Sequence, residues 1–385
     1  MEKYFTITII KISFVFLMIS CSSEDSSENN ASDSIFVITN PITNITQIKA
    51  IGGGEIMGGT SATIMSKGLV WSTSHNPTLD DNYTNEGSGN MSFNSNINDL
   101  NLTTNYYVRA YVTTSNETIY GEEVSFITLD HNIYDGEIIF TTQGQIDEFG
   151  QEGYTKITIG IIVYESEPGN ITSLAPLETL LEIGNIDPID NFSIQIADNS
   201  NLTSLNGLQN LREVKGGITL SNNPSLKSIE QLSFITDITG TLQLSKLPGI
   251  INLQPFENLT SIGRHLLIEQ MTVQDFSGLQ GITSIGASFV IQDNDNLLNL
   301  DGINNLNTIG SDFKIRDNTQ IYNLNGLSNL QYVGNNLSVH DNTSLSDFCG
   351  ITPIITNDGV QGAVNIFFNA YNPTEQDIIN GNCSQ

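Results

Sequence analysis

Basic residues are scarce in this chain of 385 residues. It carries 13 Lys and Arg against 42 Asp and Glu, which gives a formal net charge of −29. A chain this acidic repels the phosphate backbone, so the composition excludes a nucleic-acid-binding protein. The length indicates about two domains.

Catalytic and metal-binding motifs are also missing. The four histidines, His75, His131, His265 and His340, are scattered without the spacing of metal ligands. No H-E-x-x-H, P-loop or G-x-S-x-G sequence stands in a fitting context. The interpretation is a protein that is not an enzyme and has no cofactor.

Cysteine is rare, and no apolar run after the first 20 residues is long enough to cross a membrane. Residues 1–20 carry two lysines and then an apolar run at 12–19, too short for a span with flanks, which indicates a secretory signal. Cys21 follows it, and residues 21–33 form a polar tether with nothing that could pack. The remaining pair, Cys349 and Cys383, predicts one disulfide in an oxidising compartment.

What the second half does contain is a repeat. The phrase Phe289-x-Ile291-x-x-Asn294 returns as Phe313-x-Ile315-x-x-Asn318 and as Leu337-x-Val339-x-x-Asn342. The position of Ile291 recurs about every 24 residues, at Ile196, Leu220, Leu244, Ile268, Ile291, Ile315 and Val339. A fixed period of this size is the signature of a solenoid, which we assign to residues 131–385.

Each repeat predicts one rung of stacked structure. The alternating phrase is a short strand with two side chains inward and one outward. The three-residue spacing of Ile303, Leu306 and Ile309 returns apolar side chains to the same interior. Gly310 and Gly334 then stand where we expect a tight turn with positive φ. No rung can bury its apolar face alone, so neighbouring rungs must stack.

The Asn at each strand end predicts a ladder. Asn tolerates left-handed geometry, and its amide can bond backbone groups of the turn. The predicted ladder residues are Asn199, Asn223, Asn294, Asn318 and Asn342. Leu247 and Met271 interrupt them, which indicates either local turn variation or an altered surface.

A row of carboxylates precedes three of these asparagines, at Asp293, Asp317 and Asp341. Stacked rungs would hold them about 4.8 Å apart, where like charges repel. One interpretation is solvated Asp paired locally with Arg316; the other is a calcium site.

The outward side chains of the last strands form a candidate ligand face, consisting of Leu267, Val290, Gln292, Lys314, Arg316 and His340. Mixed apolar and basic surface on a rigid sheet suits an acidic ligand or a glycan. The alternative is that Lys314 and Arg316 only neutralise the Asp row.

Residues 34–128 have a different sequence pattern, without the repeat. Short apolar strands such as 68–72 and 106–112 alternate with turn signals, which predicts a β-sandwich with Trp71 in its core. Between the two domains, a strand at 137–140 and a short helix at 143–149 indicate an N-terminal solenoid cap. After Asn342 the repeat is expected to stop, with a C-terminal cap from Cys349 onward.

Two resemblances follow from these phrases. Ile309-Gly310-x-x-Phe313-x-Ile315-x-x-Asn318 resembles the receptor L-domain, the right-handed β-helical solenoid of the insulin and epidermal growth factor receptor ectodomains. Leucine-rich repeats are similar, but carry Leu three places before the strand, whereas Ile309 precedes Phe313 by four. Residues 34–128, with Gly68-Leu69-Val70-Trp71-Ser72, resemble a fibronectin type III or Ig-like module. Both resemblances imply a mainly β fold, and neither implies a specific ligand.

The N-terminus also carries a resemblance. Met18-Ile19-Ser20-Cys21 is similar to a bacterial lipobox, which implies cleavage before Cys21 and a lipid on its thiol. The acidic stretch 22–25 resembles the export signal of Bacteroidetes-type surface lipoproteins. These similarities imply an outer membrane lipoprotein exposed on the cell surface. The alternatives are an ordinary signal peptide with an incidental Cys and a plain polar tether.

The sequence therefore indicates a lipid-anchored recognition or adhesion protein whose solenoid binds a glycan or protein partner. The alternatives are an accessory protein or, less in keeping with the motifs, an enzyme in polysaccharide capture, or a structural spacer. The sequence sets neither the ligand nor the oligomeric state.

Overall fold

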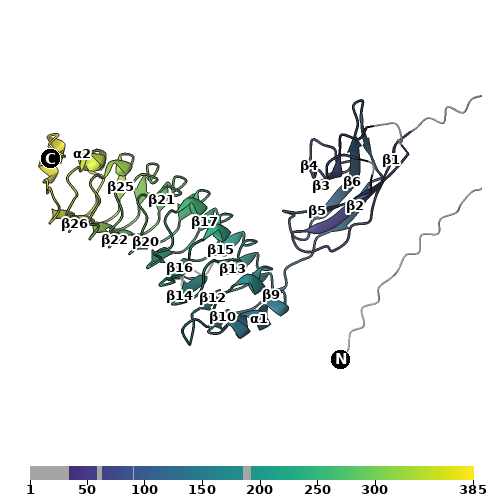
Figure 1. Ribbon diagram of the computed structural model, residues 1–385. Helices are drawn as coiled ribbons and strands as arrows, with labels where there is room; N and C mark the ends of the chain where they lie inside the picture. Colours follow the sequence, from purple (N-terminus) through teal and green to yellow (C-terminus); the bar gives the residue numbers. More distant parts are fainter. Residues whose placement is uncertain (1–33, 59–62, 90, 185–191) are drawn as a thin grey trace, which may run out of the picture. The chain divides into compact units, whose positions relative to one another are not determined.

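The computed structural model describes residues 34–58, 63–89, 91–184 and 192–385. The chain divides into two compact units, one ending at Leu129 and the other beginning at Asp130 (Figure 1). The proposed signal, the tether and Cys21 lie outside the described residues. In the described part of the chain, no helix has the length and apolar character needed to cross a membrane.

The first unit consists of two antiparallel sheets. One has the order β1–β2–β5, with β1 at Phe36–Thr39, β2 at Ala50–Met57 and β5 at Phe93–Ile97. The other runs β4–β3–β6–β7, with β8 also on β6, and its strands are β3 (Ser66–Ser72), β4 (Asn82–Tyr83), β6 (Asn105–Thr113), β7 (Thr118–Tyr120) and β8 (Val124–Ile127). Phe93 and Ile97 of the first sheet share a core with Leu69 and Val108 of the second, and Trp71 packs against it.

The second unit is a solenoid with two parallel sheets along its length (Figure 1). Its ten-stranded sheet consists of β10 (Glu137–Phe140), β12 (Gly160–Val163), β14 (Ile194–Ala197), β16 (Ile218–Ser221), β18 (Leu242–Ser245), β20 (Leu266–Glu269), β22 (Phe289–Gln292), β24 (Phe313–Arg316), β26 (Leu337–His340) and β27 (Val364–Phe367). Its nine-stranded sheet consists of β9 (Ile133–Tyr134), β11 (Lys156–Ile157), β13 (Glu182–Gly184), β15 (Glu213–Lys215), β17 (Asp237–Ile238), β19 (Ser261–Ile262), β21 (Ser284–Ile285), β23 (Thr308–Ile309) and β25 (Tyr332–Val333). The mainly β, solenoidal fold that the repeat predicts is confirmed.

Short helices complete the rungs and cover the ends. The 3-10 turns are η1 (Ala175–Leu177), η2 (Glu230–Leu232), η3 (Gln254–Phe256), η4 (Asn325–Leu327) and η5 (Cys349–Ile351). Helix α1 (Gln143–Gln151) begins with a capping box from Thr142 and buries Ile146 and Phe149 at the N-terminal end. Helices α2 (Thr352–Thr356) and α3 (Glu375–Ile379) lie in the C-terminal segment, which the Cys349–Cys383 disulfide closes.

The rung interior is packed as the periodicity predicts. In β22, β24 and β26, the first and third side chains are buried and the second is partly exposed. Ile303, Leu306 and Ile309 are also buried. Phe289 and Phe313 stack on each other across two rungs, with ring centroids 5.1 Å apart. Fully burying side chains of this size stabilises by about 1.5–3 kcal/mol each.

The glycines after each rung differ from expectation. Neither Gly310 nor Gly334 has a positive φ. Instead, a Cβ at Gly310 would lie 2.1 Å from the carbonyl oxygen of Gly286, and one at Gly334 would lie 2.2 Å from that of Gly310. These positions require glycine because stacked backbones approach each other closely, not because of the turn.

The repeat also continues one strand further than expected. Strand β27 pairs in parallel with β26, in the register Val339 to Ile366 and His340 to Phe367. The expectation that the repeat stops after Asn342 is therefore wrong.

Candidate functional site

The predicted ladder asparagines are all fully buried at the ends of their strands. The side-chain nitrogen of Asn318 donates to Asn342 Oδ1 at 3.2 Å and to the backbone oxygen of Ile291, in the preceding rung, at 3.1 Å. Its backbone N–H donates to the same Asn342 oxygen at 3.0 Å. Each Asn thus satisfies backbone groups that would otherwise be buried without partners.

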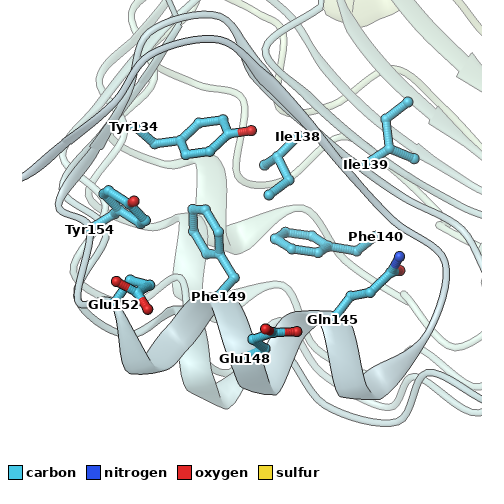
Figure 2. A pocket seen from close by; sticks show the side chains of 9 residues that line it. All are labelled: Tyr134, Ile138, Ile139, Phe140, Gln145, Glu148, Phe149, Glu152 and Tyr154. Carbon is cyan, nitrogen blue, oxygen red and sulfur yellow. The ribbon is translucent and has the colours of Figure 1, made fainter.

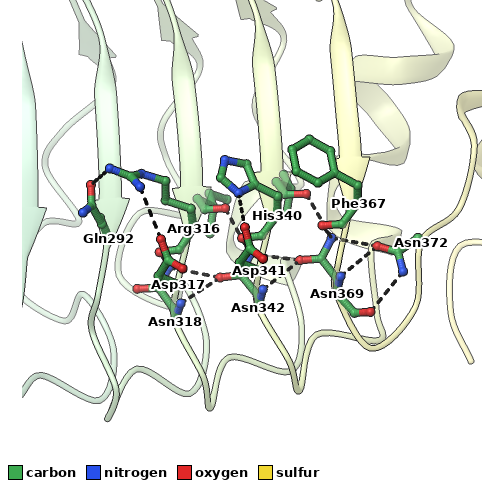
Figure 3. Close-up of polar contacts among 12 residues, drawn as sticks. Gln292, Arg316, Asp317, Asn318, His340, Asp341, Asn342, Phe367, Asn369 and Asn372 are labelled. Atoms are coloured by element: carbon green, nitrogen blue, oxygen red, sulfur yellow. Dashed lines mark hydrogen bonds and ion pairs between the residues drawn. The ribbon is translucent and has the colours of Figure 1, made fainter.

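The ladder is longer than predicted. Asn342 donates to Asn369 Oδ1 at 3.0 Å, and Asn369 donates to Asn372 Oδ1 at 3.1 Å (Figure 3). The signal was present in the sequence, because Val364-x-Ile366-x-x-Asn369 is the same phrase as in the earlier rungs. The ladder therefore connects the regular rungs to the C-terminal cap.

At the two interruptions of the Asn ladder, an apolar residue replaces Asn inside an otherwise similar turn. Leu247 and Met271 are buried, and the backbone N–H of Met271 still donates to Asn294 Oδ1 at 2.9 Å. The residues before them, Lys246 and Gln270, keep the same left-handed φ as in the other rungs. This favours local turn variation over an altered surface.

The left-handed residue is not the ladder Asn but the one before it. The positive-φ residues at this position are Asp198, Asn222, Lys246, Gln270, Asp293, Asp317, Asp341 and Phe368. Asp and Asn tolerate this conformation better than other non-glycine residues. The Asp row thus has a conformational reason to exist that does not involve a cation.

Each carboxylate of the Asp row is bound by the residue before it. Gln292 Nε2 donates to Asp293 at 2.7 Å, and Arg316 Nη1 lies 3.3 Å from Asp317 Oδ2. His340 Nδ1 lies 2.7 Å from Asp341 Oδ2 (Figure 3). Among the described residues, no group of three or more His, Cys, Asp or Glu side chains is placed to hold a metal ion. The local pairing fits the first interpretation of the row, and nothing here favours calcium.

The six residues of the candidate ligand face lie on adjacent strands. Leu267 is in register with Val290 and Val290 with Lys314, while Gln292 is in register with Arg316 and Arg316 with His340. Arg316 also bonds Gln292, whereas Lys314 lies 3.9 Å from Asp312. Of the two basic residues Lys314 and Arg316, only Arg316 therefore pairs with the Asp row.

Phe367 extends this face beyond the predicted residues. Its ring stacks on that of His340, with centroids 4.7 Å apart and planes 5° apart, and it is 41% exposed (Figure 3). Phe368 is 72% exposed and packs edge-on against Phe367 at 5.3 Å. We call Gln292, Arg316, His340 and Phe367 the terminal column of the face.

A separate charged cluster lies on the nine-stranded sheet. Glu182 Oε1 is 2.8 Å from Lys156 Nζ and 2.7 Å from Lys215 Nζ, and His131 Nε2 is 3.4 Å from its other oxygen. Burial raises the pKa of Glu182, but hydrogen bonds from the two lysines outweigh it, so the net pKa lies below its usual value. The hydrogen bond to Glu182 raises the pKa of Lys215. Burial lowers the pKa of His131. The cluster joins three adjacent strands, and we read it as structural.

Comparison with known proteins finds a family match in the first part of the solenoid. The sequence profile of the receptor L domain family matches residues 132–232, from the strand β9 to the turn η2. No curated protein matches the chain. Among solved structures, the sensor domain of the anti-sigma factor RsgI4 in Pseudobacteroides cellulosolvens is similar at 19% identity, with a TM-score of 0.21, over 25% of this chain and 94% of that one. Residues 132–232 thus have a receptor L domain-like fold, which implies in general terms a role in ligand recognition.

Proposed function

We propose that the protein is a lipid-anchored, non-catalytic recognition protein of the outer membrane surface, and that the terminal column binds a glycan. The observation that carries the proposal is the exposed ring of Phe367, held in register beside His340 and Arg316 on a rigid sheet. An aromatic face packs against the C–H face of a sugar ring, while neighbouring polar groups fix its orientation.

The charges of the face favour a neutral glycan over the acidic ligand. Arg316 is paired with Asp317, His340 lies against Asp341, and Lys314 is near Asp312. These pairs present donors and acceptors side by side without a net positive field. Sugar hydroxyls both donate and accept hydrogen bonds, so they match such a surface.

The conformation of Phe368 supports a ligand at this end. It occupies the left-handed position that Asp holds in the three preceding rungs, with φ 57°. A bulky residue in this region is strained, and such strain is common at ligand-binding sites. Its large exposure means that folding gains little from the ring. A ligand contact would give the ring a role.

The remaining parts of the proposal rest on the sequence. The lipobox-like stretch would anchor the chain, and the fibronectin type III-like sandwich would hold the solenoid away from the membrane. A role in polysaccharide capture and a role in adhesion both use the same face. A purely structural spacer would have no use for the exposed rings at the last strand.

A glycan array with the purified full-length protein, followed by calorimetry on the best saccharide, tests the proposal. We expect Phe367→Ala, and separately the Lys314→Ala/Arg316→Ala double variant, to weaken binding at least about tenfold at an unchanged melting temperature. Gln195→Ala, at an outward position of β14, is the matched control and should bind normally. Unchanged affinity in both folded variants, or binding to protein ligands alone, would contradict the glycan site.

A further inference from the structure

An open cavity of about 300 Å³ lies at the N-terminal end of the solenoid, far along the ten-stranded sheet from the terminal column. Its aromatic wall consists of Tyr134 of β9, Phe140 of β10, Phe149 of α1 and Tyr154 (Figure 2). Glu148 and Glu152 line it on the side of the helix. These residues belong to no repeat phrase, so the solenoid periodicity does not account for them.

The four rings form one cluster. Tyr134 is nearly perpendicular to Phe149 and to Tyr154, with centroids 5.4 and 5.5 Å away, and Phe140 lies edge-on to Phe149 at 5.3 Å. Phe140 and Phe149 are buried, whereas Tyr134 and Tyr154 remain partly exposed at the cavity. Aromatic faces carry a negative potential, so a wall of several rings attracts a cation that has shed part of its water.

The two glutamates strengthen this potential. Both are exposed and stand four residues apart at the C-terminal end of α1, Glu148 within the helix and Glu152 as its C-cap, where no basic residue accompanies them. Like charges at this spacing and acidic groups at a helix C-terminus both disfavour the helix. Within the described part of the chain, neither carboxylate has a hydrogen-bonding or ion-pair partner, unlike those of the Asp row. Helix stability therefore does not explain their presence beside the aromatic cavity.

We propose that this cavity binds an organic cation bearing an alkylated or quaternary ammonium group. The rings would contact its methyl groups, and Glu148 and Glu152 would neutralise its charge. No basic side chain lines the cavity among the described residues to compete with it. The site is independent of the glycan face, because it uses other strands and prefers a cation, whereas the glycan face favours a neutral ligand.

Calorimetric titration of the purified full-length protein with choline tests the proposal. The control ligand is 3,3-dimethylbutan-1-ol, which has the same shape but no charge. We expect choline to bind at least about tenfold more tightly than the neutral alcohol, as a desolvated cation–π contact requires. Absence of choline binding, or equal binding of the two ligands, would overturn the proposal.

Variants locate the site. Glu148→Gln/Glu152→Gln changes only exposed groups, so the protein should fold normally and lose at least about fivefold in choline affinity while keeping its affinity for the alcohol. Tyr154→Leu should weaken choline binding as well. Glu167→Gln removes an exposed carboxylate that does not line the cavity and serves as the charge control. If Glu167→Gln weakens choline as much as the double variant does, the attraction is the general field of an acidic protein and the site is refuted.

Discussion

At the scale of single residues, each ladder asparagine forms hydrogen bonds with the neighbouring rungs. Asn318 accepts two bonds from Asn294 in the preceding rung, and its backbone N–H donates to Asn342 in the next rung. Its side-chain nitrogen also donates to the backbone oxygens of Ile291 in the preceding rung and of Arg316 in its own strand. Alanine keeps the backbone N–H but cannot make the side-chain bonds, so backbone groups buried in the stack would be left unpaired.

We therefore expect Asn318→Ala to lower the free energy of unfolding of the solenoid by about 1–3 kcal/mol, measured by urea denaturation. Asn365→Ala is the matched control, because Asn365 is exposed in the same unit and makes one long contact of 3.4 Å with Ser338. Its effect should stay within about 0.5 kcal/mol. Equal losses in the two variants would mean that the buried ladder adds nothing.

The glycine column gives a second prediction. Gly310→Ala would place a methyl group 2.1 Å from a backbone oxygen of the rung before it, so the stack must shift. We expect a loss of about 1–3 kcal/mol in the same assay. Gly144→Ala, inside α1 with its nearest neighbour 4.0 Å from the new Cβ, should instead stabilise by about 0.5–1 kcal/mol. A harmless Gly310→Ala would show that the rungs can separate at this position.

Some residue-level features could be read from the sequence and others could not. One rung geometry repeated many times makes Phe313, Ile315 and Asn318 predictable from their spacing. The sequence predicts the left-handed position one residue too late, since Asp317 and Asn318 both tolerate this conformation and only the backbone distinguishes them. The reason for the regular spacing of Gly310 and Gly334 is also not visible in the sequence, because the close approach between rungs involves residues that are distant along the chain.

At the scale of elements, both proposed binding sites lie at the ends of the solenoid. The terminal column depends on β27, whose register brings Phe367 beside His340. The N-terminal cavity depends on β9, β10 and α1, which share no phrase with the later rungs. The N-terminal cavity lies in segments that do not repeat, so spacing arguments fail there, whereas Phe367 stands in the repeat phrase Val364-x-Ile366-x-x-Asn369 and could have been found from it.

The charged cluster on β11, β13 and β15 gives an element-level prediction. In Glu182→Gln, the Lys156 and Lys215 ammonium groups would lose the counter-charge that they share, and Lys215 would keep only the more exposed Glu213. Both lysines are partly exposed, so we expect a loss of about 1–3 kcal/mol at pH 7, below the range for fully buried pairs. Glu213→Gln removes the more exposed partner of Lys215, 3.4 Å away, and should cost at most about 1 kcal/mol.

The pH dependence follows from the directions of the shifts. Glu182 has a pKa below its ordinary 4.5 in the folded chain, so its stabilisation is present above pH 4.5 and is lost as pH falls through the folded pKa. Burial lowers the pKa of His131 from its ordinary 6.5. Protonation of His131 therefore likewise disfavours the folded state once pH falls below 6.5. Thermal melts should show wild type losing stability in acid and Glu182→Gln losing less below pH 4.5. A constant gap between the two proteins across this range would exclude Glu182 as a source of acid sensitivity.

At the scale of the whole molecule, the chain combines a strongly acidic composition with a solenoid at whose two ends we propose different binding sites. A net charge of −29 keeps such a chain soluble but gives it no electrostatic affinity for an anionic membrane surface. The membrane attachment that we propose therefore requires a hydrophobic anchor.

The lipid on Cys21 is the anchor that the sequence predicts. Replacing Cys21 by Ala should move the protein from the membrane pellet to the soluble fraction, because one lipidated residue would supply essentially all of the membrane affinity. Ser20→Thr and Ser23→Ala variants, which keep the Cys, serve as controls for changes near the cleavage site. Protease added to intact cells should digest the wild-type protein if the acidic stretch 22–25 directs it outward. Retention of Cys21→Ala in the membrane pellet would refute the lipid anchor, and full protection of the wild type would place the protein on the periplasmic side.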